Sequence, residues 1–261
     1  MTIGSLSSNF KYLVSLIREY KNWWQICIQT INGKGTDVVI LRNGLRIEAA
    51  KDSHLLVIMN EIFRMEVYNP SGFTIETNDI VVDIGANVGV FTMFAAQRTR
   101  NKVYSFEPFQ GNIEFLNRNV SNNDLSNVFV HSVAVSAENG YTKLFLAEIP
   151  GGHLLFDHNI KGKLEKYVNV PTITLQYIID KNNLPKIDFL KMDCEGAEGS
   201  ILMSTPKDYL RRINKIAMEF HDNVSELKHE EIRKLLEEVG FTTELSWDGQ
   251  SPLGYLYAKM N

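Results

Sequence analysis

The sequence predicts an α/β fold with a mostly parallel sheet, helices on both faces and an antiparallel hairpin at its end. From Asp79 onward, short apolar runs alternate with helical stretches, and this rhythm requires parallel strands joined by helical crossovers. The last two apolar runs, 241–247 and 255–260, flank a short loop around Asp248-Gly249, which permits an antiparallel hairpin. The 261 residues are 44% apolar, enough to bury one large core and to carry an appendage.

The main domain is expected over residues 79–261. Its parallel strands are expected over residues 80–83, 103–107, 128–135, 187–193 and 213–220. Helices are expected from Gly85 to about residue 98, over 110–122 and over about 225–239. An insertion at about 140–175 contains two strand-like runs, 141–147 and 167–173, and we expect it over the carboxyl ends of the strands. His153 and His158 in this insertion belong either to a ligand-facing loop or to a plain surface loop.

Residues 1–78 are expected to form a helical and strand appendage. Apolar residues between positions 10 and 31 predict one or two amphipathic helices, and charged residues interrupt this stretch too often for a membrane span. Two short strands, 37–41 and 45–49, flank the hairpin dipeptide Asn43-Gly44, and a helix is expected over 54–64. We expect the first helices to pack on the domain, with a membrane-surface or oligomer contact through Trp23 and Trp24 as the alternative.

Charge and cysteine content restrict the partners and the compartment. The chain has 27 Lys and Arg against 31 Asp and Glu, a net charge of −4, so a basic nucleic-acid-binding surface is not expected. A small or moderately sized neutral ligand suits this balance better. Cys27 and Cys194 are far apart and form no metal or disulfide motif, and a reducing cytoplasm is therefore the expected location.

The segment from Val81 to Thr92 contains the strongest motif. A buried strand ends at Asp83 and is followed by Gly85, Asn87 and Gly89, small residues that let a turn pass close to a ligand. Glu107 lies 22 positions after Gly85, near the ~20-residue spacing at which an acid binds ribose hydroxyls. A nicotinamide dinucleotide is disfavoured, because the Gly-x-Gly-x-x-Gly pattern is absent and Asp83 would repel a pyrophosphate. The alternative is a glycine-rich turn between strand and helix that is required only for packing.

Three segments together resemble the FkbM family of methyltransferases: Asp83-Ile-Gly-Ala-Asn-Val-Gly89, Ser105-Phe-Glu-Pro108 and Leu190-Lys-Met-Asp-Cys-Glu-Gly-Ala-Glu198. The similarity extends from about Val81 to His221, over half the chain. It implies a Rossmann-like class I methyltransferase fold, S-adenosylmethionine as cofactor and methylation of a hydroxyl, often on a sugar, glycan, glycolipid or secondary metabolite. Family members with carboxylate acceptors leave the acceptor open. Cys194 replaces the family's usual Val or Ile and is interpreted as a small apolar side chain.

The cofactor-binding residues are assigned by their chemistry and by their positions at the ends of strands. Asp83 is expected to meet the methionine ammonium directly or through water, while Gly85, Asn87 and Gly89 leave room for the methionine portion. Glu107 is expected to accept hydrogen bonds from both ribose hydroxyls. Ser132 and Val133, at the expected end of the third strand, are candidates for the adenine site, although an ordinary strand end explains them equally well. Asp193 is assigned to the cofactor and to catalysis, facing the transferred methyl group or the acceptor.

The catalytic candidates follow the fourth and fifth strands. Glu195 and Glu198 are expected on one face of a helix, where acids also simply complement the helix dipole. His221, with an ordinary pKa near ~6.5, or Glu195 is expected to remove the acceptor's proton. Asp193, Glu219 and Asp222 are an alternative Mg²⁺ site, but the main interpretation contains no metal.

Other functions on the same fold are a carboxylate O-methyltransferase, a nucleic-acid methyltransferase and a cofactor-binding protein without catalysis. Amino-methylating adenine enzymes have an Asn/Asp-Pro-Pro-aromatic run after the fourth strand, where this chain has Asp193-Cys-Glu-Gly. The oligomeric state is left open.

Overall fold

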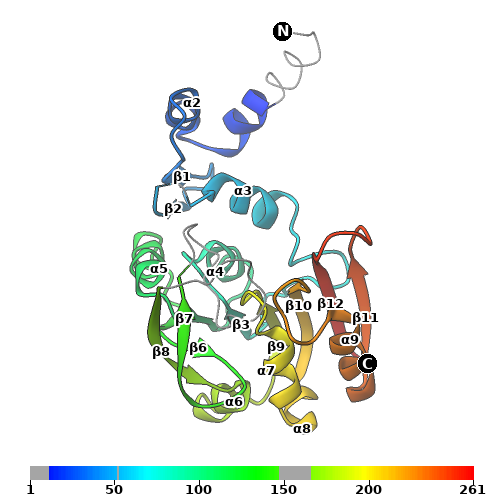
Figure 1. The fold of residues 1–261 in the computed structure, drawn as a ribbon. Coiled ribbons are helices and arrows are strands. Elements are labelled where there is room, and N and C mark those ends of the chain that lie inside the picture. Colours follow the sequence, from blue (N-terminus) through cyan, green and yellow to red (C-terminus); the bar gives the residue numbers. More distant parts are fainter. Residues whose placement is uncertain (1–11, 52, 147–165) are drawn as a thin grey trace.

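A computed structural model describes residues 12–51, 53–146 and 166–261 (Figure 1). Its centre is a seven-stranded sheet in the order β11-β12-β10-β9-β3-β4-β5. Strands β3, β4, β5, β9 and β10 are parallel, and β12 runs antiparallel to both of its neighbours, β10 and β11. The predicted fold class is confirmed. The bounds of these strands are β3 Val81–Ile84, β4 Val103–Phe106, β5 Val128–His131, β9 Ile187–Met192, β10 Ile213–His221, β11 Phe241–Ser246 and β12 Leu253–Met260.

Helices cover both faces of this sheet, so every residue of β3, β4 and β9 is buried. Because side chains alternate along a strand, Val82 and Ile84 pack into one core and Val81 packs into the other. The first core also contains apolar residues of α6, α7 and α9, and the second those of α4 and α5. These helices have the bounds α4 Val90–Ala96, α5 Gln110–Asn122, α6 Leu175–Lys181, α7 Glu198–Ser204 and α9 His229–Val239, and the short α8 Lys207–Leu210 follows α7.

The strand order reverses at β3. The chain builds outward from β3 through β4 to β5 and then returns to the other side of β3 with β9. Ligands of open α/β sheets bind beyond the carboxyl ends of the strands at this switch point. The loop after β3 and the loop after β9 are therefore the expected walls of a site, and Asp83 pairs in register with Ser105 on one side and Lys191 on the other.

The appendage forms the predicted helices and hairpin. Residues 12–19 are helical, and α2 Trp23–Ile31, β1 Val38–Ile40, β2 Arg46–Glu48, α3 Leu55–Met59 and the π-helical turn η1 Asn60–Arg64 follow. Leu16, Tyr20 and Ile26 are buried in the apolar cluster that extends through the β1–β2 hairpin to α4 and α5, and the Lys21 amide donates to the Ile40 carbonyl of this hairpin at 2.7 Å. Trp24 remains half exposed. In the part of the chain that the structure describes, no helix is both long and apolar enough to cross a membrane.

Two predictions about the bounds of secondary-structure elements are wrong. The third strand does not run from 128 to 135: it breaks at Ser132 and Val133, and the short strand β6 Ala134–Val135 leaves the main sheet. There it pairs with β8 Tyr167–Ile173, which also pairs with β7 Gly140–Phe145. The last helix starts at His229 rather than near 225, where the Glu231 carboxylate accepts the Lys228 amide at 3.0 Å and the Asp222 carboxylate accepts the His229 amide at 2.9 Å. His153 and His158 lie outside the described residues.

Candidate active site

Two pockets adjoin one another at the carboxyl ends of the parallel strands. The smaller has about 600 Å³ of empty space and is lined mainly from the ends of β3, β4 and β9 and from β6 and β7. The larger has about 1410 Å³ and adds residues of the appendage and of β10. Gly85, Asn87, Asp193 and Glu195 line both pockets. A group held in one pocket therefore faces the contents of the other across these four residues.

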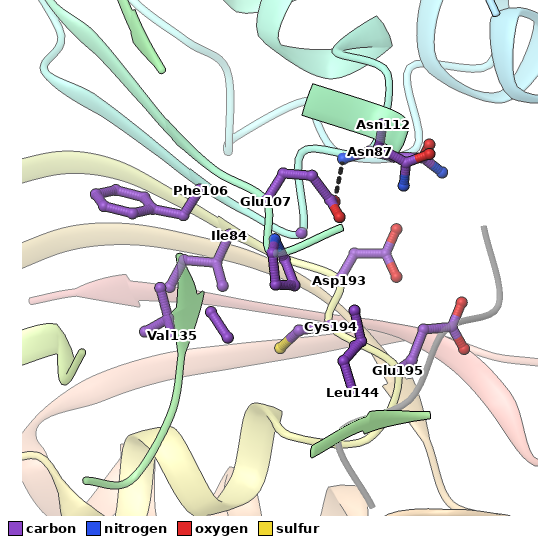
Figure 2. Close-up of a pocket in the computed structure, with 13 residues that line it drawn as sticks. Ile84, Asn87, Phe106, Glu107, Asn112, Val135, Leu144, Asp193, Cys194 and Glu195 are labelled. Atoms are coloured by element: carbon purple, nitrogen blue, oxygen red, sulfur yellow. Dashed lines mark hydrogen bonds between the residues drawn. The ribbon is translucent and has the colours of Figure 1, made fainter. Parts of the chain in front are cut away.

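Glu107 is the acid that lines the smaller pocket but not the larger one (Figure 2). Its Oε2 accepts a hydrogen bond from the Asn87 amide at 2.8 Å, and its Oε1 accepts one from the Phe109 amide at 2.8 Å. Burial raises the pKa of Glu107 to about 7, although these two amides and Asn112 oppose the shift. Each oxygen keeps a second lone pair for a ligand hydroxyl. The pocket thus offers a fixed carboxylate suited to a vicinal diol.

Apolar residues occupy the opposite side of this pocket. In Figure 2, Phe106, Ile84 and Val135 lie across from Glu107, Asp193 and Glu195. Leu144 of β7 and Ala134 of β6 complete the apolar wall, so β7, the first described part of the insertion, contributes to the pocket at the carboxyl ends of the strands. Ser132 is exposed, and neither it nor Val133 lines the pocket. Because the strand breaks at Ser132 and Val133, the next two residues, Ala134 and Val135, line the pocket instead.

The glycines of the first loop are required mainly by protein contacts. Gly85 has φ +77°, and a Cβ there would lie 1.7 Å from the carbonyl oxygen of Asp193. Gly89 has φ +92°, and a Cβ there would lie 2.3 Å from a methyl group of Leu116. Asn87 also adopts a positive φ of 51°. Gly85 and Asn87 line both pockets, whereas Gly89 lines neither and serves the packing of α4 on α5.

Asp83 lies behind the site rather than on its wall. It is fully buried, accepts a 2.7 Å hydrogen bond from the Thr92 hydroxyl and lies 3.2 Å from Lys191 Nζ. Lys191 in turn donates to the Gly85 carbonyl at 2.8 Å and lines the larger pocket. Asp83 lines neither pocket, and Lys191 lies between its carboxylate and the wall of the larger one.

The loop after β9 is shaped by a buried carboxylate. Glu195 has φ +54° and Gly196 has φ +102°, so α7 begins only at Glu198. The prediction that Glu195 and Glu198 share a helical face is wrong for this reason. Glu198 is fully buried and accepts hydrogen bonds from the amides of Cys194 at 2.8 Å and Gly196 at 3.0 Å. It thereby fixes the turn that presents Glu195 to both pockets.

His221 lies among carboxylates at the end of β10. Its Nδ1 is 3.3 Å from Glu198, and its Nε2 is 3.6 Å from Glu195 and 3.9 Å from Asp193. Burial by itself would lower the pKa of His221, but the hydrogen bond and charge of Glu198 and the charges of Asp193 and Glu195 raise it to about 10. His221 is therefore an imidazolium at neutral pH, and this charge state does not suit the base suggested by its ordinary pKa.

The same environment also raises the pKa values of Glu195 and Glu219. For these carboxyl groups a raised pKa favours the neutral form, whereas for His221 it favours the charged form. Burial and the charge of Asp193 raise the pKa of Glu195 to about 7 and that of Glu219 to about 8, against the attraction of His221. Burial also raises the pKa of Cys194, so its thiol is neutral where it lines the smaller pocket. This agrees with the interpretation of Cys194 as a small apolar side chain.

Asp193, Glu219 and His221 place ligand atoms within 4.8 Å of one another. Asp222 does not join them, because its carboxylate is 2.6 Å from His229 Nδ1 and accepts the His229 amide at 2.9 Å. The expected Mg²⁺ set of Asp193, Glu219 and Asp222 is thus not assembled. His221 takes the third place in the cluster.

Two residues of the larger pocket were missed by the sequence analysis. Lys191 is one of two charged residues, with Asp188, in a strand that is buried throughout, and a lysine in such a strand was a usable signal. Tyr68 comes from the segment between η1 and β3 and carries no local motif. Its hydroxyl lies 2.9 Å from Asp193 Oδ2 and 3.1 Å from Glu219 Oε2.

The topology and the paired pockets define a class I methyltransferase that uses S-adenosylmethionine. The central sheet closes with the antiparallel hairpin of this class, and the smaller pocket, which contains Glu107, opens onto a larger one. Residues 83–243 match the family model described as the methyltransferase FkbM domain. The chain belongs to the FkbM methyltransferase family.

Curated relatives carry several different names. The chain is 25% identical over 219 residues to the AMB antimetabolite synthetase AmbE of Pseudomonas aeruginosa, covering 70% of this chain but only 10% of that protein. It is 25% identical to the hexuronic acid methyltransferase AglP of Haloferax volcanii, covering 66% of each chain. It is 24% identical to the 31-O-demethyl-FK506 methyltransferase FkbM of Streptomyces tacrolimicus, covering 80% of this chain and 90% of that protein.

Proposed function

We propose that this methyltransferase is an O-methyltransferase acting on a hydroxyl of a sugar, glycan, glycolipid or secondary metabolite. The observation that carries the proposal is the junction of the two pockets at Asp193 and Glu195. A cofactor in the smaller pocket and an acceptor in the larger one would meet beside these carboxylates. Methyl transfer to a hydroxyl is an in-line displacement at the methyl carbon, and the main contribution of the protein is to align the reacting groups.

The residues of the smaller pocket fit S-adenosylmethionine. Glu107 would accept from the two ribose hydroxyls, and Phe106, Val135 and Leu144 would contact the adenine, in place of Ser132 and Val133. Gly85 and Asn87 leave room for the methionine portion, and Asp83 contributes by neutralising Lys191. When bound, the cofactor supplies an electrophilic methyl group on a sulfonium.

Glu195 is the favoured base. It lines both pockets, and its pKa of about 7 matches the requirement for a base at neutral pH. His221 is charged at this pH and lies 3.6 Å from Glu195, so it would position Glu195 and stabilise its ionised form. Asp193 would hold the acceptor or face the transferred methyl group.

The acceptor class rests on the larger pocket and on the relatives. Its walls combine carboxyl groups with aromatic and aliphatic side chains, a lining suited to a polyhydroxylated molecule with apolar parts. The printed names of the relatives refer to a hexuronic acid and to FK506, which favours sugars and secondary metabolites. A carboxylate acceptor is the second candidate, because a hexuronic acid carries both a carboxylate and hydroxyls. The net charge of −4 disfavours nucleic acid.

The test is transfer of labelled methyl from S-adenosylmethionine to panels of sugars, uronic acids and hydroxylated natural products. A methyl ether resists mild alkali, whereas a methyl ester is hydrolysed. Glu195→Gln should lower kcat by about 10²–10⁴-fold while the affinity for S-adenosylhomocysteine stays near wild type. Ester products, with Glu195→Gln retaining most of its kcat, would reject the hydroxyl acceptor.

A further inference from the structure

The helix α2 exposes three large apolar side chains, which we call the α2 stripe. Trp24, Ile28 and Ile31 are 52%, 52% and 83% exposed, and their spacing of four and three residues places them on one face of the helix. Ile26, on the opposite face, is fully buried in the apolar cluster that extends through the β1–β2 hairpin. The helix therefore has two apolar faces, and the described part of the chain covers one of them.

The α2 stripe belongs to a region rich in exposed apolar residues. The helical residues before α2 expose Tyr12, Val14 and Ile17. Among the described residues, six of the 17 exposed large hydrophobic side chains thus lie between positions 12 and 31. Figure 1 shows α2 and the preceding helical turns at the end of the molecule that lies away from the sheet and from α6. Such a concentration of apolar side chains indicates an interaction surface.

Positive charges lie at both ends of the stripe. The helix α2 itself contains no charged residue, and the exposed residues Lys21 and Lys34 precede and follow it. Gly33 has φ +63°, and the Lys34 amide donates to the Gln29 carbonyl at 2.9 Å, so the backbone of Lys34 is held against the last turn of the helix. Asp37 lies beside α2, where its carboxylate accepts a hydrogen bond from the Gln29 side chain at 2.8 Å.

The charge balance of the whole region favours an anionic partner. Residues 12–49 contain five Lys and Arg against three Asp and Glu, whereas the whole chain contains 27 against 31. The region is thus basic within an acidic protein. An uncharged apolar helix face with a tryptophan and flanking lysines complements an anionic lipid surface, where tryptophan rings lie at the level of the headgroups and lysines attract the phosphates.

A second copy of the chain fits the α2 stripe less well. Most homodimers pair the same surface around a twofold axis. With α2 antiparallel to its copy, Lys21 would face Lys34 of the other copy, and with parallel helices each lysine would face itself. Like charges across an interface are unfavourable, and α2 contains no acidic residue that could neutralise them. The charges therefore favour a lipid surface over a dimer.

We propose that the α2 stripe and its two flanking lysines bind the surface of an anionic lipid bilayer, with α2 lying in the plane of the interface. The inference goes beyond the proposed function, because this binding needs neither cofactor nor acceptor. The appendage also supplies Ser53 and Tyr68 to the larger pocket, so it would connect the lipid surface with the acceptor site.

The apolar part of the proposal is tested by co-sedimentation of the full-length protein with vesicles of phosphatidylcholine that contain one third phosphatidylglycerol. We expect the wild-type protein to bind. The double variant Ile28→Ser, Ile31→Ser should lower the partition coefficient by about 10- to 100-fold, because it removes apolar area from the contact. Tyr141→Ser, which removes an 81% exposed ring from β7, is the matched control and should bind as the wild type does.

The electrostatic part is tested with the double variant Lys21→Gln, Lys34→Gln. Its partition coefficient should be lower than that of the wild type by about 10- to 30-fold, since each lysine near an anionic surface contributes to binding. Lys181→Gln at the exposed end of α6 is the control and should have no effect. Vesicles of pure phosphatidylcholine should bind the wild-type protein correspondingly more weakly.

Tryptophan fluorescence locates the contact on the protein. Vesicles should shift the emission of the wild-type protein to shorter wavelength, because the ring of Trp24 enters a less polar environment. Trp24→Phe keeps an aromatic ring in the stripe, so it should retain most of the binding and lose this shift. A shift that persists in Trp24→Phe would assign the contact to Trp23 or Trp247 and contradict the proposal.

Three further results would overturn the proposal: no binding of the wild-type protein to the anionic vesicles, equal binding to pure phosphatidylcholine, or equal losses in Ile28→Ser, Ile31→Ser and in Tyr141→Ser. Sedimentation velocity without lipid tests the second copy, and a dimer that dissociates in Ile28→Ser, Ile31→Ser would show that another chain covers the stripe. The substituted side chains are exposed, so the melting temperature of each variant should stay near that of the wild type, which separates loss of binding from loss of folding.

Discussion

At the scale of single residues, the glycines after β3 are explained by close contacts within the protein as well as by the need to leave room for a ligand. Gly85 passes so close to the Asp193 carbonyl that no side chain fits. The same contact joins the loop after β3 to the loop after β9, and both loops line the two pockets. Local backbone geometry and the site are therefore coupled at this residue.

Gly85→Ala should lower the free energy of unfolding by about 2–4 kcal/mol, from the positive φ and the clash with backbone. Gly249 has the same φ of +77° but open space around its Cα, so Gly249→Ala isolates the conformational part and should cost about 1–2 kcal/mol. Urea unfolding of both variants measures the difference. Equal costs would show that the contact with Asp193 contributes nothing.

Glu107 should make cofactor binding depend on pH. Its pKa is about 7, and only the ionised carboxylate can accept from both ribose hydroxyls. The affinity for S-adenosylhomocysteine should therefore fall about tenfold from pH 8 to pH 6, since one proton must be displaced. Calorimetric titration with S-adenosylhomocysteine from pH 6 to pH 8 measures this change in affinity. Glu107→Gln should bind more weakly at pH 8 and lose most of this slope, and an unchanged slope would assign it to another group.

At the scale of elements, the loop between β9 and α7 determines where the side chain of Glu195, the base that we propose, lies. Its positive φ at Glu195 delays the helix and turns that side chain into the pockets. Glu198 stabilises this turn from behind by accepting two backbone amides and by lying beside His221. One buried carboxylate thus connects the loop after β9 with the end of β10.

Glu198→Gln should lower the free energy of unfolding by about 2–4 kcal/mol, because an amide oxygen replaces a charged acceptor of two amides and leaves His221 without its partner. It should also lower the pKa of His221, which Glu198 raises. Urea unfolding and NMR titration of the imidazole measure the two effects. Glu244→Gln on the exposed part of β11 is the control, and a loss no larger than in this control would contradict the assigned role of Glu198.

At the scale of the whole molecule, the site is assembled from the appendage, the sheet and the insertion. The larger pocket brings Ser53 and Tyr68 together with residues of β9 and β10, and the smaller pocket takes Leu144 from the insertion. The site therefore collects ionisable groups from distant parts of the chain in one buried region. Because the pKa values of these groups differ between the folded and the unfolded protein, the free energy of unfolding depends on pH.

Stability should decrease from about pH 5 to about pH 10. Glu195 and Glu219 have raised pKa values of about 7 and 8, so the folded state holds their protons more tightly, and stability falls as each ionises. His221 has a raised pKa of about 10, so its contribution is complete below pH 6.5 and disappears as the pH approaches 10. Melting temperatures measured across this range check the prediction.

In that series, the double variant Glu195→Gln, Glu219→Gln should reduce the decline between pH 5 and pH 8, and the part that remains there belongs to Glu107 and His221, whose pKa values are also raised. The decline at higher pH, which belongs to His221, should remain. Maximal stability of the wild-type protein near pH 8 would contradict these assignments.

The sequence by itself determined the parallel sheet, its closing hairpin and the two acids Glu107 and Asp193, because hydrophobic periodicity and residues at strand ends are local properties. Only the tertiary structure decided that β6 leaves the main sheet, since that choice depends on pairing with β8, more than 30 positions along the chain. It also decided the charge states. Asp83 is a buried partner of Lys191, and the pKa values of His221 and Glu195 are both raised, because a pKa depends on burial and on charges contributed by other elements.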